Sequence, residues 1–393
     1  MHILIIPSWY KTPQQPVSGT FFEEHARMLV NKGFKVGVLY PSLHSRYNFK
    51  AALRQFVHKD QPEDLVDKGI PTLYSFSNSI VPSRFQQVNN WFVCYAAYRK
   101  YKKYVSQYGQ PDIIHAQSVF VGGWVARYIS RKENIPYIFT EHTSSILHSK
   151  WITSDKVTKG IVKKTFSDAK RSVFVSNSFR QNLISKYDLP SINAVTIPNV
   201  VNPLFYSTAL KKEKAIPFIL LCIALLGKNK QHMLLFNSIS MILKKGYDIK
   251  LNLVGDGPDK NELIQYAKKL RIDHIITFMG AQSREAVKEE IDRAHIVVSA
   301  SRFESFGLSI VEAFACGRPV VAIDSGGPGD SINPENGILI QENVPEKLAE
   351  GIISVMNNYE NYDQEKIKAD CLRKYSESAV WELLKPVYEA AIN

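Results

Sequence analysis

The chain has 393 residues, with 45% hydrophobic side chains, 22% charged side chains and a formal net charge of +12. This length favours two domains over one, and the composition excludes a disordered or fibrous protein. No apolar run approaches the roughly 20 residues that a membrane-spanning helix needs, so we expect no transmembrane segment.

The excess positive charge lies in the first half of the chain. Residues 1–200 contain 26 Lys and Arg against 12 Asp and Glu, whereas residues 201–393 contain 23 against 25. This excess indicates an anionic partner for the first half, and both nucleic acid and a membrane surface are candidates. Residues 85–108 interleave aromatic and basic side chains. They predict either a helix with a core face and a solvated basic face, or a helix lying on anionic lipid.

The first seven residues are apolar and lack the basic start of a signal peptide, so they predict a buried strand. The four cysteines show no paired spacing: Cys94, Cys222, Cys316 and Cys371. We therefore expect buried, reduced thiols in a cytoplasmic protein.

Apolar runs and amphipathic segments alternate along the chain, as they do in doubly wound parallel α/β sheets. An amphipathic helix is predicted for Phe21–Lys32, with Gly33 as its C-terminal cap. The strands expected in the first half are Ile3–Pro7, Val36–Leu39, Ile113–His115, Tyr137–Thr140, Ser172–Val175 and Ala194–Ile197. Those expected in the second half are Phe218–Leu225, Ile249–Val254, Ile275–Met279, Ile296–Ser299 and Pro319–Ile323.

Residues 198–203 read Pro-Asn-Val-Val-Asn-Pro, which breaks helix and strand alike and predicts a hinge between two domains. A last helical pattern covers Ala379–Ile392.

The most informative motif runs from Ser301 to Ala322. A predicted strand leads directly to Glu304, and Glu312 follows eight residues later. In a strand–loop–helix unit this loop lies at the carboxyl edge of a parallel sheet, where α/β proteins bind ligands. The N–H groups from Ser305 to Leu308 would face an anion or hydroxyl groups, with Glu312 about 12 Å further along the helix.

This motif resembles the E-x₇-E signature of retaining glycosyltransferase family 4, and residues 198–203 resemble the hinge of that family. The resemblance implies a GT-B fold, in which two Rossmann-like doubly wound domains face a central cleft. It divides the chain into an acceptor-side domain (1–200), a nucleotide-sugar domain (201–373) and a helix (374–393) that returns to the first domain. The implied reaction moves a hexose-type sugar from a nucleotide-sugar, a UDP-sugar by expectation, to an acceptor hydroxyl with the α linkage retained. Bacterial surface polysaccharide or glycolipid biosynthesis is the expected setting.

Donor-side roles follow from the resemblance. Glu304 would lie by the donor sugar together with the backbone of Phe306, Gly307 and Leu308, and Glu312 would bind the ribose. Lys230 falls at the family's diphosphate-binding Lys. Leu225 stands at the family's Arg position, so Lys228 would supply the second charge. Met279 lies in a Phe-Met-Gly stretch that resembles the family's nucleobase contact. The loops 255–258 and 325–330 are predicted glycine turns. The first resembles the family's turn that frames the nucleotide site, and the second either borders the donor site or only turns the chain.

First-domain motifs are looser. Gly19 precedes the first helix and resembles the family's glycine loop near the donor phosphate, with Ser18 or Thr20 as a candidate helix cap. His115, Gln117 and His142 resemble acceptor-side positions, although Gln117 stands where many members carry His. Catalytic roles are expected for Glu304, His142 and Lys230.

No Asp-x-Asp and no His/Cys cluster has metal-ligand spacing, so we expect neither a metal nor another cofactor. The expected partners are the nucleotide-sugar, a carbohydrate or lipid-linked acceptor, and the anionic inner face of the cell membrane. Two alternatives stay open. A GT-B nucleotide-sugar 2-epimerase would share the donor site, and a nucleic-acid-binding protein would explain the basic half.

Overall fold

The computed structural model describes residues 1–12, 18–44, 63–79, 81, 86–148, 156–189, 193–206 and 214–392. The chain forms two compact units. Unit 1 comprises Met1–Val175, Arg180–Ile197 and Trp381–Asn393, and unit 2 comprises Ser176–Phe179 and Pro198–Val380.

Unit 1 is built on a sheet of eight strands among the described residues, in the order β3-β4-β2-β1-β5-β6-β7-β8. The strands are β1 (His2–Pro7), β2 (Lys35–His44), β3 (Leu65–Asp67), β4 (Ile70–Asn78), β5 (Ile113–Gln117), β6 (Tyr137–Glu141), β7 (Arg171–Phe174) and β8 (Ala194–Thr196). All neighbouring pairs are parallel except β3 with β4, which form an antiparallel edge. The predicted strands of this half are confirmed, and β3 and β4 were not predicted.

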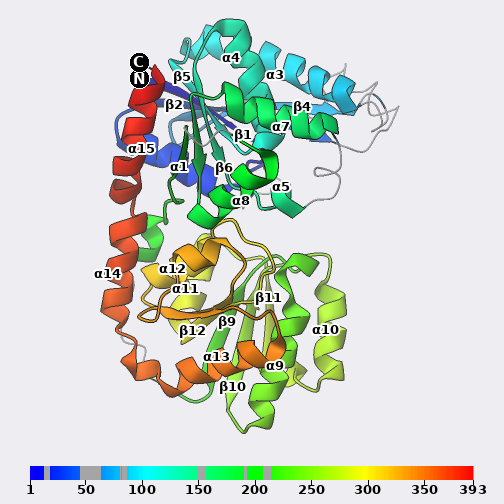
Figure 1. Ribbon diagram of the computed structural model, residues 1–393, viewed down its shortest axis with the longest axis vertical. Coiled ribbons are helices and arrows are strands. Elements are labelled where there is room, and N and C mark those ends of the chain that lie inside the picture. Colours follow the sequence, from blue (N-terminus) through cyan, green and yellow to red (C-terminus); the bar gives the residue numbers. More distant parts are fainter. Residues whose placement is uncertain are drawn as a thin grey trace. The chain divides into compact units, whose positions relative to one another are not determined.

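The α-helices described in unit 1 are α1 (Thr20–Asn31), α3 (Gln86–Tyr108), α4 (Trp124–Glu133), α5 (Ser145–His148), α7 (Lys156–Asp168), most of α8 (Asn177–Tyr187) and, from the C-terminal end of the chain, most of α15 (Glu377–Ile392). The predicted first helix is confirmed, and Gly33 beyond its end has φ 83°, the left-handed conformation that glycine tolerates. Figure 1 shows α3, α4 and α7 packed next to one another. No helix in the described ranges combines the length and apolarity that crossing a bilayer demands.

The end of the chain packs against its beginning within unit 1. The Tyr388 hydroxyl on α15 lies 2.6 Å from Nδ1 of His115 on β5. The rings of Phe34 and Trp381 are 5.2 Å apart between centroids. Aromatic side chains from α15 therefore complete the core of the N-terminal sheet.

Unit 2 contains a parallel sheet whose described strands run in the order β11-β10-β9-β12-β13-β14. These strands are β9 (Phe218–Ile223), β10 (Ile249–Val254), β11 (Ile276–Gly280), β12 (Ile296–Ser299), β13 (Val320–Ile323) and β14 (Gly337–Ile340). The longer helices are α9 (His232–Lys244), α10 (Lys260–Lys269), α11 (Arg284–Arg293), α12 (Leu308–Ala315), α13 (Pro345–Asn357) and α14 (Gln364–Tyr375). The short 3₁₀ helices include η4 (Lys228–Lys230). The five predicted strands are confirmed, and β14 was not predicted.

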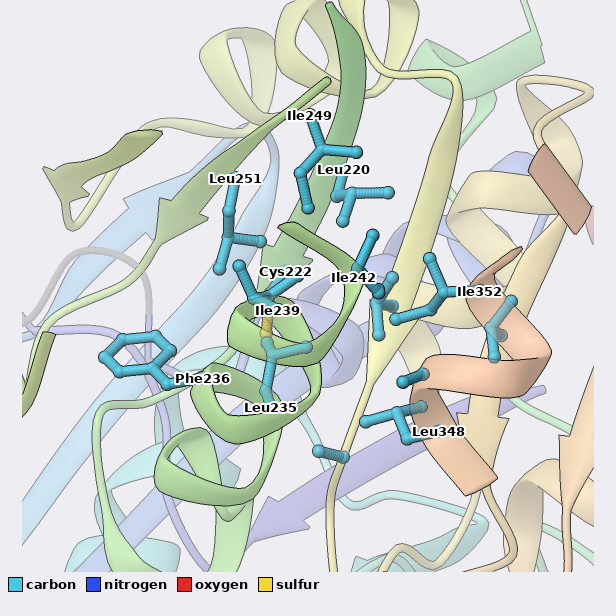
Figure 2. Packing of buried hydrophobic residues seen from close by; sticks show 14 of the residues in the cluster. Leu220, Cys222, Leu235, Phe236, Ile239, Ile242, Ile249, Leu251, Leu348 and Ile352 are labelled. Carbon is cyan, nitrogen blue, oxygen red and sulfur yellow. The ribbon is translucent and has the colours of Figure 1, made fainter. Parts of the chain in front are cut away.

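Strand and helix side chains interdigitate in the core of unit 2 (Figure 2). Leu220 and Cys222 on β9 pack against Leu235 and Ile239 on α9, all at most 4% exposed. Each buried aliphatic side chain of this kind contributes roughly 1.5–3 kcal/mol to stability. Burial raises the pKa of the Cys222 thiol to about 12. All four cysteines are buried and unpaired, as predicted.

Candidate functional site

The loop between β12 and α12 carries the first element of the candidate site in unit 2. It ends at Gly307, the N-cap of α12, whose φ of 86° is left-handed and favours glycine. The N–H groups of Phe306 and Gly307 have no hydrogen-bond partner within the described part of the chain. Donors without a partner at a helix N-terminus are suited to an anion or a hydroxyl-rich ligand.

A second glycine loop supports this first loop. Glu304 N–H donates to Ser325 O at 3.0 Å, and Gly327 N–H donates to Glu304 O at 3.0 Å. A β-carbon at Gly327 would lie 2.4 Å from the nitrogen of Phe306, so only glycine fits there. The predicted glycine turn at 325–330 therefore lies directly against the Glu304 loop and fixes its backbone.

The short helix η4, which follows β9 in the chain, makes hydrogen bonds to the same loop. The Asn229 side-chain amide donates to Phe303 O at 3.0 Å, and Arg302 N–H donates to Asn229 O at 2.8 Å. Lys230 forms an ion pair with Glu304, and both side chains are about one-fifth exposed. Lys228 lies at the exposed start of η4. The structure thus brings together the Lys and the Glu that the sequence assigned to neighbouring parts of one donor.

Glu312 is the fifth residue of α12, just over one turn from the start of the helix rather than the two turns expected, and is 3% exposed. Its Oε1 accepts a hydrogen bond from Arg284 Nη1 at 2.5 Å, and the Arg284 guanidinium stacks 4.9 Å above the Phe205 ring. Burial raises the pKa of Glu312, and the charge and hydrogen bond of Arg284 oppose that rise. The guanidinium therefore favours an ionised carboxylate in a position where burial alone would favour a protonated one.

Met279 lies near the end of β11, half-buried, and its carbonyl accepts a hydrogen bond from Gln282 Nε2 at 2.6 Å. The neighbouring turn at 255–258 is close-packed. Gly255 N–H donates to Gly280 O at 2.8 Å, and a β-carbon at Gly255 would lie 1.9 Å from Ala224 O. The glycine at this position is required by packing between the β9 and β10 loops.

In unit 1, Gly19 is the N-cap of α1, with φ 68°. A β-carbon there would lie 2.8 Å from Trp9 O, so the turn into the helix requires glycine. The expectation that Ser18 or Thr20 caps this helix is wrong, because the N-cap residue is Gly19, which has no side chain to bond to the first turn.

Gln117 and His142 meet at the carboxyl ends of β5 and β6. His142 Nε2 lies 2.6 Å from Gln117 Oε1, an amide oxygen that can only accept, so this ring nitrogen carries the proton. The rings of Phe21 and Phe22 lie 4.9 and 5.1 Å from the His142 ring. The hydrogen bond to Gln117 therefore fixes the orientation of the half-buried His142 ring.

The sequence grouped His115 with these acceptor-side residues, but the structure places it elsewhere. It has no exposed surface, and its two ring nitrogens bond to Tyr388 Oη at 2.6 Å and Thr140 Oγ1 at 2.7 Å. Burial lowers the pKa of His115 well below its ordinary value. Its ring belongs to the packing between α15 and the sheet.

Two family models match the chain in succession, "Glycosyltransferase Family 4" over residues 18–204 and "Glycosyl transferases group 1" over residues 208–370. The chain belongs to glycosyltransferase family 4. Its two α/β units, in which the sheet strands are mostly parallel, are the Rossmann-like domains of the GT-B fold.

Among curated relatives of this glycosyltransferase, the putative teichuronic acid biosynthesis glycosyltransferase TuaC of Bacillus subtilis is 24% identical over 356 residues, 90% of this chain and 88% of that protein. Alpha-monoglucosyldiacylglycerol synthase of Streptococcus pneumoniae is 26% identical over 244 residues, 58% of this chain and 55% of that protein. Among solved structures, sucrose-phosphate synthase from Thermosynechococcus elongatus has a TM-score of 0.77 at 16% identity, covering 99% of this chain and 98% of the other. Anabaena HepE in complex with UDP and glucose has a TM-score of 0.72 at 16% identity, covering 99% and 100%.

Sequence reasoning missed two charged residues of this family-4 glycosyltransferase. One is Arg284, the partner of Glu312. The other is Glu141, fully buried at the end of β6, whose carboxylate accepts the N–H groups of Val119, His142 and Thr143 at 2.8–2.9 Å. Burial raises the pKa of Glu141 to about 7, although these three donors oppose the rise. An acidic residue directly before His142 at a strand end was the available signal.

In the described ranges, no three His, Cys, Asp or Glu side chains gather as metal ligands would. Catalysis without a metal stays a prediction.

Proposed function

We propose that the protein is a retaining glycosyltransferase that moves a hexose-type sugar from a UDP-sugar to an acceptor hydroxyl in surface polysaccharide or glycolipid biosynthesis. The arrangement in unit 2 carries this proposal. A Lys230–Glu304 pair lies beside the N-terminus of α12, and a buried, charge-paired Glu312 lies about one turn further along the helix.

Each group has a part suited to its surroundings. The Lys230 ammonium, with Lys228 as a second cation, would bind the diphosphate, and the N–H groups of Phe306 and Gly307 would help to hold the donor. These charges would also stabilise the negative charge that grows on the leaving phosphate in the transition state. Glu312 would accept hydrogen bonds from the ribose hydroxyls.

The donor phosphate would compete with Glu304 for the Lys230 ammonium. Glu304 would then be free to contact the reacting sugar. No side chain is positioned as an evident nucleophile, so the departing phosphate oxygen would take the acceptor proton on the same face of the sugar. Met279 would meet the nucleobase, Gly19 would lie near the donor phosphate, and His142, oriented by Gln117, would lie on the acceptor side.

The comparisons support the donor and acceptor classes. The HepE structure contains UDP and glucose, and the two relatives described above are a putative teichuronic acid biosynthesis glycosyltransferase and a synthase of alpha-monoglucosyldiacylglycerol. Acceptors of this kind are carbohydrate or lipid-linked. We therefore place the enzyme in the cytoplasm, in peripheral contact with the anionic inner face of the membrane.

A panel of UDP-, GDP- and ADP-hexoses tests the proposal. We expect one UDP-sugar to raise the melting temperature and to be hydrolysed slowly without acceptor, and the transferred sugar to keep the α configuration by NMR. Stabilisation by no nucleotide-sugar would overturn the proposal. Inversion at C2 of the donor sugar without an acceptor would identify the 2-epimerase instead.

A further inference from the structure

Unit 1 contains a cavity of about 490 Å³ between α3, α4 and α7, away from the residues assigned above. Its lining residues are Asn90, Trp91, Cys94, Trp124, Arg127, Tyr128, Arg131, Lys132, Ile161 and Thr165. The volume lies within the roughly 300–1,000 Å³ typical of small-molecule pockets. Three aromatic rings, Cys94 and Ile161 form the apolar part of its wall, and three cations with two neutral polar side chains form the rest.

The three helices around the cavity are strongly basic. Together α3, α4 and α7 carry eleven Lys and Arg but only two acidic residues, Glu133 and Asp168. Glu133 pairs with Lys102, and Asp168 pairs with Arg127. Four further cations on these helices form no ion pair with any described residue: Arg99, Lys132, Lys159 and Lys164. Most of the chain's excess positive charge therefore gathers on this layer, which suits an anionic partner.

Large apolar side chains are exposed on α3 beside the cavity, and one of them, Trp91, also lines it. Trp91 is 58% exposed and Tyr95 43% exposed, one turn apart on α3, and their rings stack at 5.5 Å with an interplanar angle of 6°. Val88, one turn earlier, is also exposed. Trp and Tyr rings with neighbouring cations are typical of protein surfaces at the headgroup level of a membrane.

We propose that this cavity binds an acyl chain of an anionic phospholipid, with the chain against Trp91, Trp124 and Ile161 and the phosphate against Arg131 and Lys132. Trp91 and Tyr95 would then lie at headgroup level and dock unit 1 on an anionic bilayer. This inference deepens the proposed function, on which it rests for the membrane setting. A lipid fits better than a nucleic acid, because a nucleic acid has no alkyl chain to fill an apolar cavity.

Cosedimentation of the full chain with vesicles tests the docking. We expect binding to phosphatidylcholine vesicles that contain phosphatidylglycerol, none to pure phosphatidylcholine, and weaker binding at high salt. Trp91→Ser with Tyr95→Ser, and Arg131→Glu with Lys132→Glu, should each weaken binding by about tenfold or more. The control, Lys244→Glu with Lys245→Glu on α9, makes the same charge change on two exposed residues of unit 2 and should bind like wild type. Equal loss in the control, or no binding to anionic vesicles, would overturn the proposal.

Calorimetry with a soluble lipid tests the cavity itself. Below its micelle concentration, dihexanoyl phosphatidylglycerol should bind wild type, whereas glycerol phosphate, which lacks the chains, should not. Ile161→Trp fills the cavity without changing charge and should abolish that binding. Unchanged binding by Ile161→Trp, or displacement of the lipid by a single-stranded oligonucleotide that binds as tightly, would overturn the lipid assignment.

The UDP-induced shift in melting temperature is recorded for every variant. Its absence throughout would refute the proposed donor chemistry and leave the lipid result standing.

Discussion

Glu304 and Glu312 lie eight residues apart but in different surroundings. Glu304 is partly exposed and paired with Lys230, whereas Glu312 is buried and paired with Arg284. We predict that Glu312→Ala weakens UDP binding by roughly tenfold to a hundredfold, since a hydrogen bond to a charged group contributes about 1.5–3 kcal/mol. Glu304→Ala should leave UDP affinity nearly unchanged and lower kcat, because it contacts the reacting sugar. Calorimetry with UDP and steady-state kinetics separate the two, and equal UDP affinity in wild type and Glu312→Ala would refute the assignment.

The Arg284–Glu312 pair makes a second prediction at the residue scale. Arg284→Met leaves a buried carboxylate without its counter-charge and should lower the free energy of unfolding by about 3 kcal/mol in urea titrations. The double variant with Glu312→Gln should recover part of that loss. The control is Arg373→Met, whose side chain is 69% exposed and pairs with the exposed Asp370 on the surface of α14, so about 1 kcal/mol or less is expected. Equal losses for Arg284→Met and Arg373→Met would show that Glu312 does not depend on its partner.

At the scale of elements, η4 and the N-terminus of α12 supply the positive potential beside the predicted diphosphate position. We therefore predict that excess chelator leaves the rate of sugar transfer nearly unchanged, while Lys230→Ala lowers it by about a hundredfold or more. Restoration of a chelator-induced loss by Mg²⁺ or Mn²⁺ would mean that a metal, and not Lys230, carries this charge.

The elements that were predicted from the sequence share one property: the spacing of apolar residues within each segment is enough to identify it as a strand or a helix. β1 and β9 are nearly continuous apolar strands buried in parallel sheets, β10 alternates apolar and polar residues, and α1 is followed by Gly33. β4 was missed because its sequence, Ile-Pro-Thr-Leu-Tyr-Ser-Phe-Ser-Asn, mixes a proline and polar residues into an otherwise apolar strand. β14 is four residues long and begins with Gly337, too little for a periodic signal.

The candidate site was predictable where neighbours in sequence are neighbours in space. Glu304, Gly307 and Glu312 belong to one strand–loop–helix unit. Their order, from the loop through the N-cap into α12, therefore followed from the sequence. Arg284 reaches Glu312 from another element, 28 residues away, and no local pattern indicates that contact. The same holds for His115, whose partner Tyr388 lies 273 residues later.

For the whole molecule, that buried histidine predicts a pH dependence of stability. His115 stays neutral in the folded state because burial, and then the nearby His25 and His142, lower its pKa. The unfolded chain takes up a proton near pH 6.5, so folding stability should fall as pH falls below that value, by about 1.4 kcal/mol per pH unit for this one group. His115→Gln should show a shallower loss of melting temperature between about pH 7 and 5 than wild type. An identical pH slope in both proteins would contradict the buried neutral ring, whatever the absolute stability of the variant.

The return of α15 to the N-terminal sheet has a consequence for how the protein is made. Trp381 and Tyr388 leave the ribosome after every residue of unit 2, yet their contacts are with Phe34 and His115. At about 5–20 residues per second, the nascent N-terminal domain waits on the order of 10 to 40 s for the segment that covers this part of its core. During synthesis the domain therefore displays an apolar face that the finished protein hides. A nascent chain stalled before residue 381 should be the species that chaperones hold and proteases cleave.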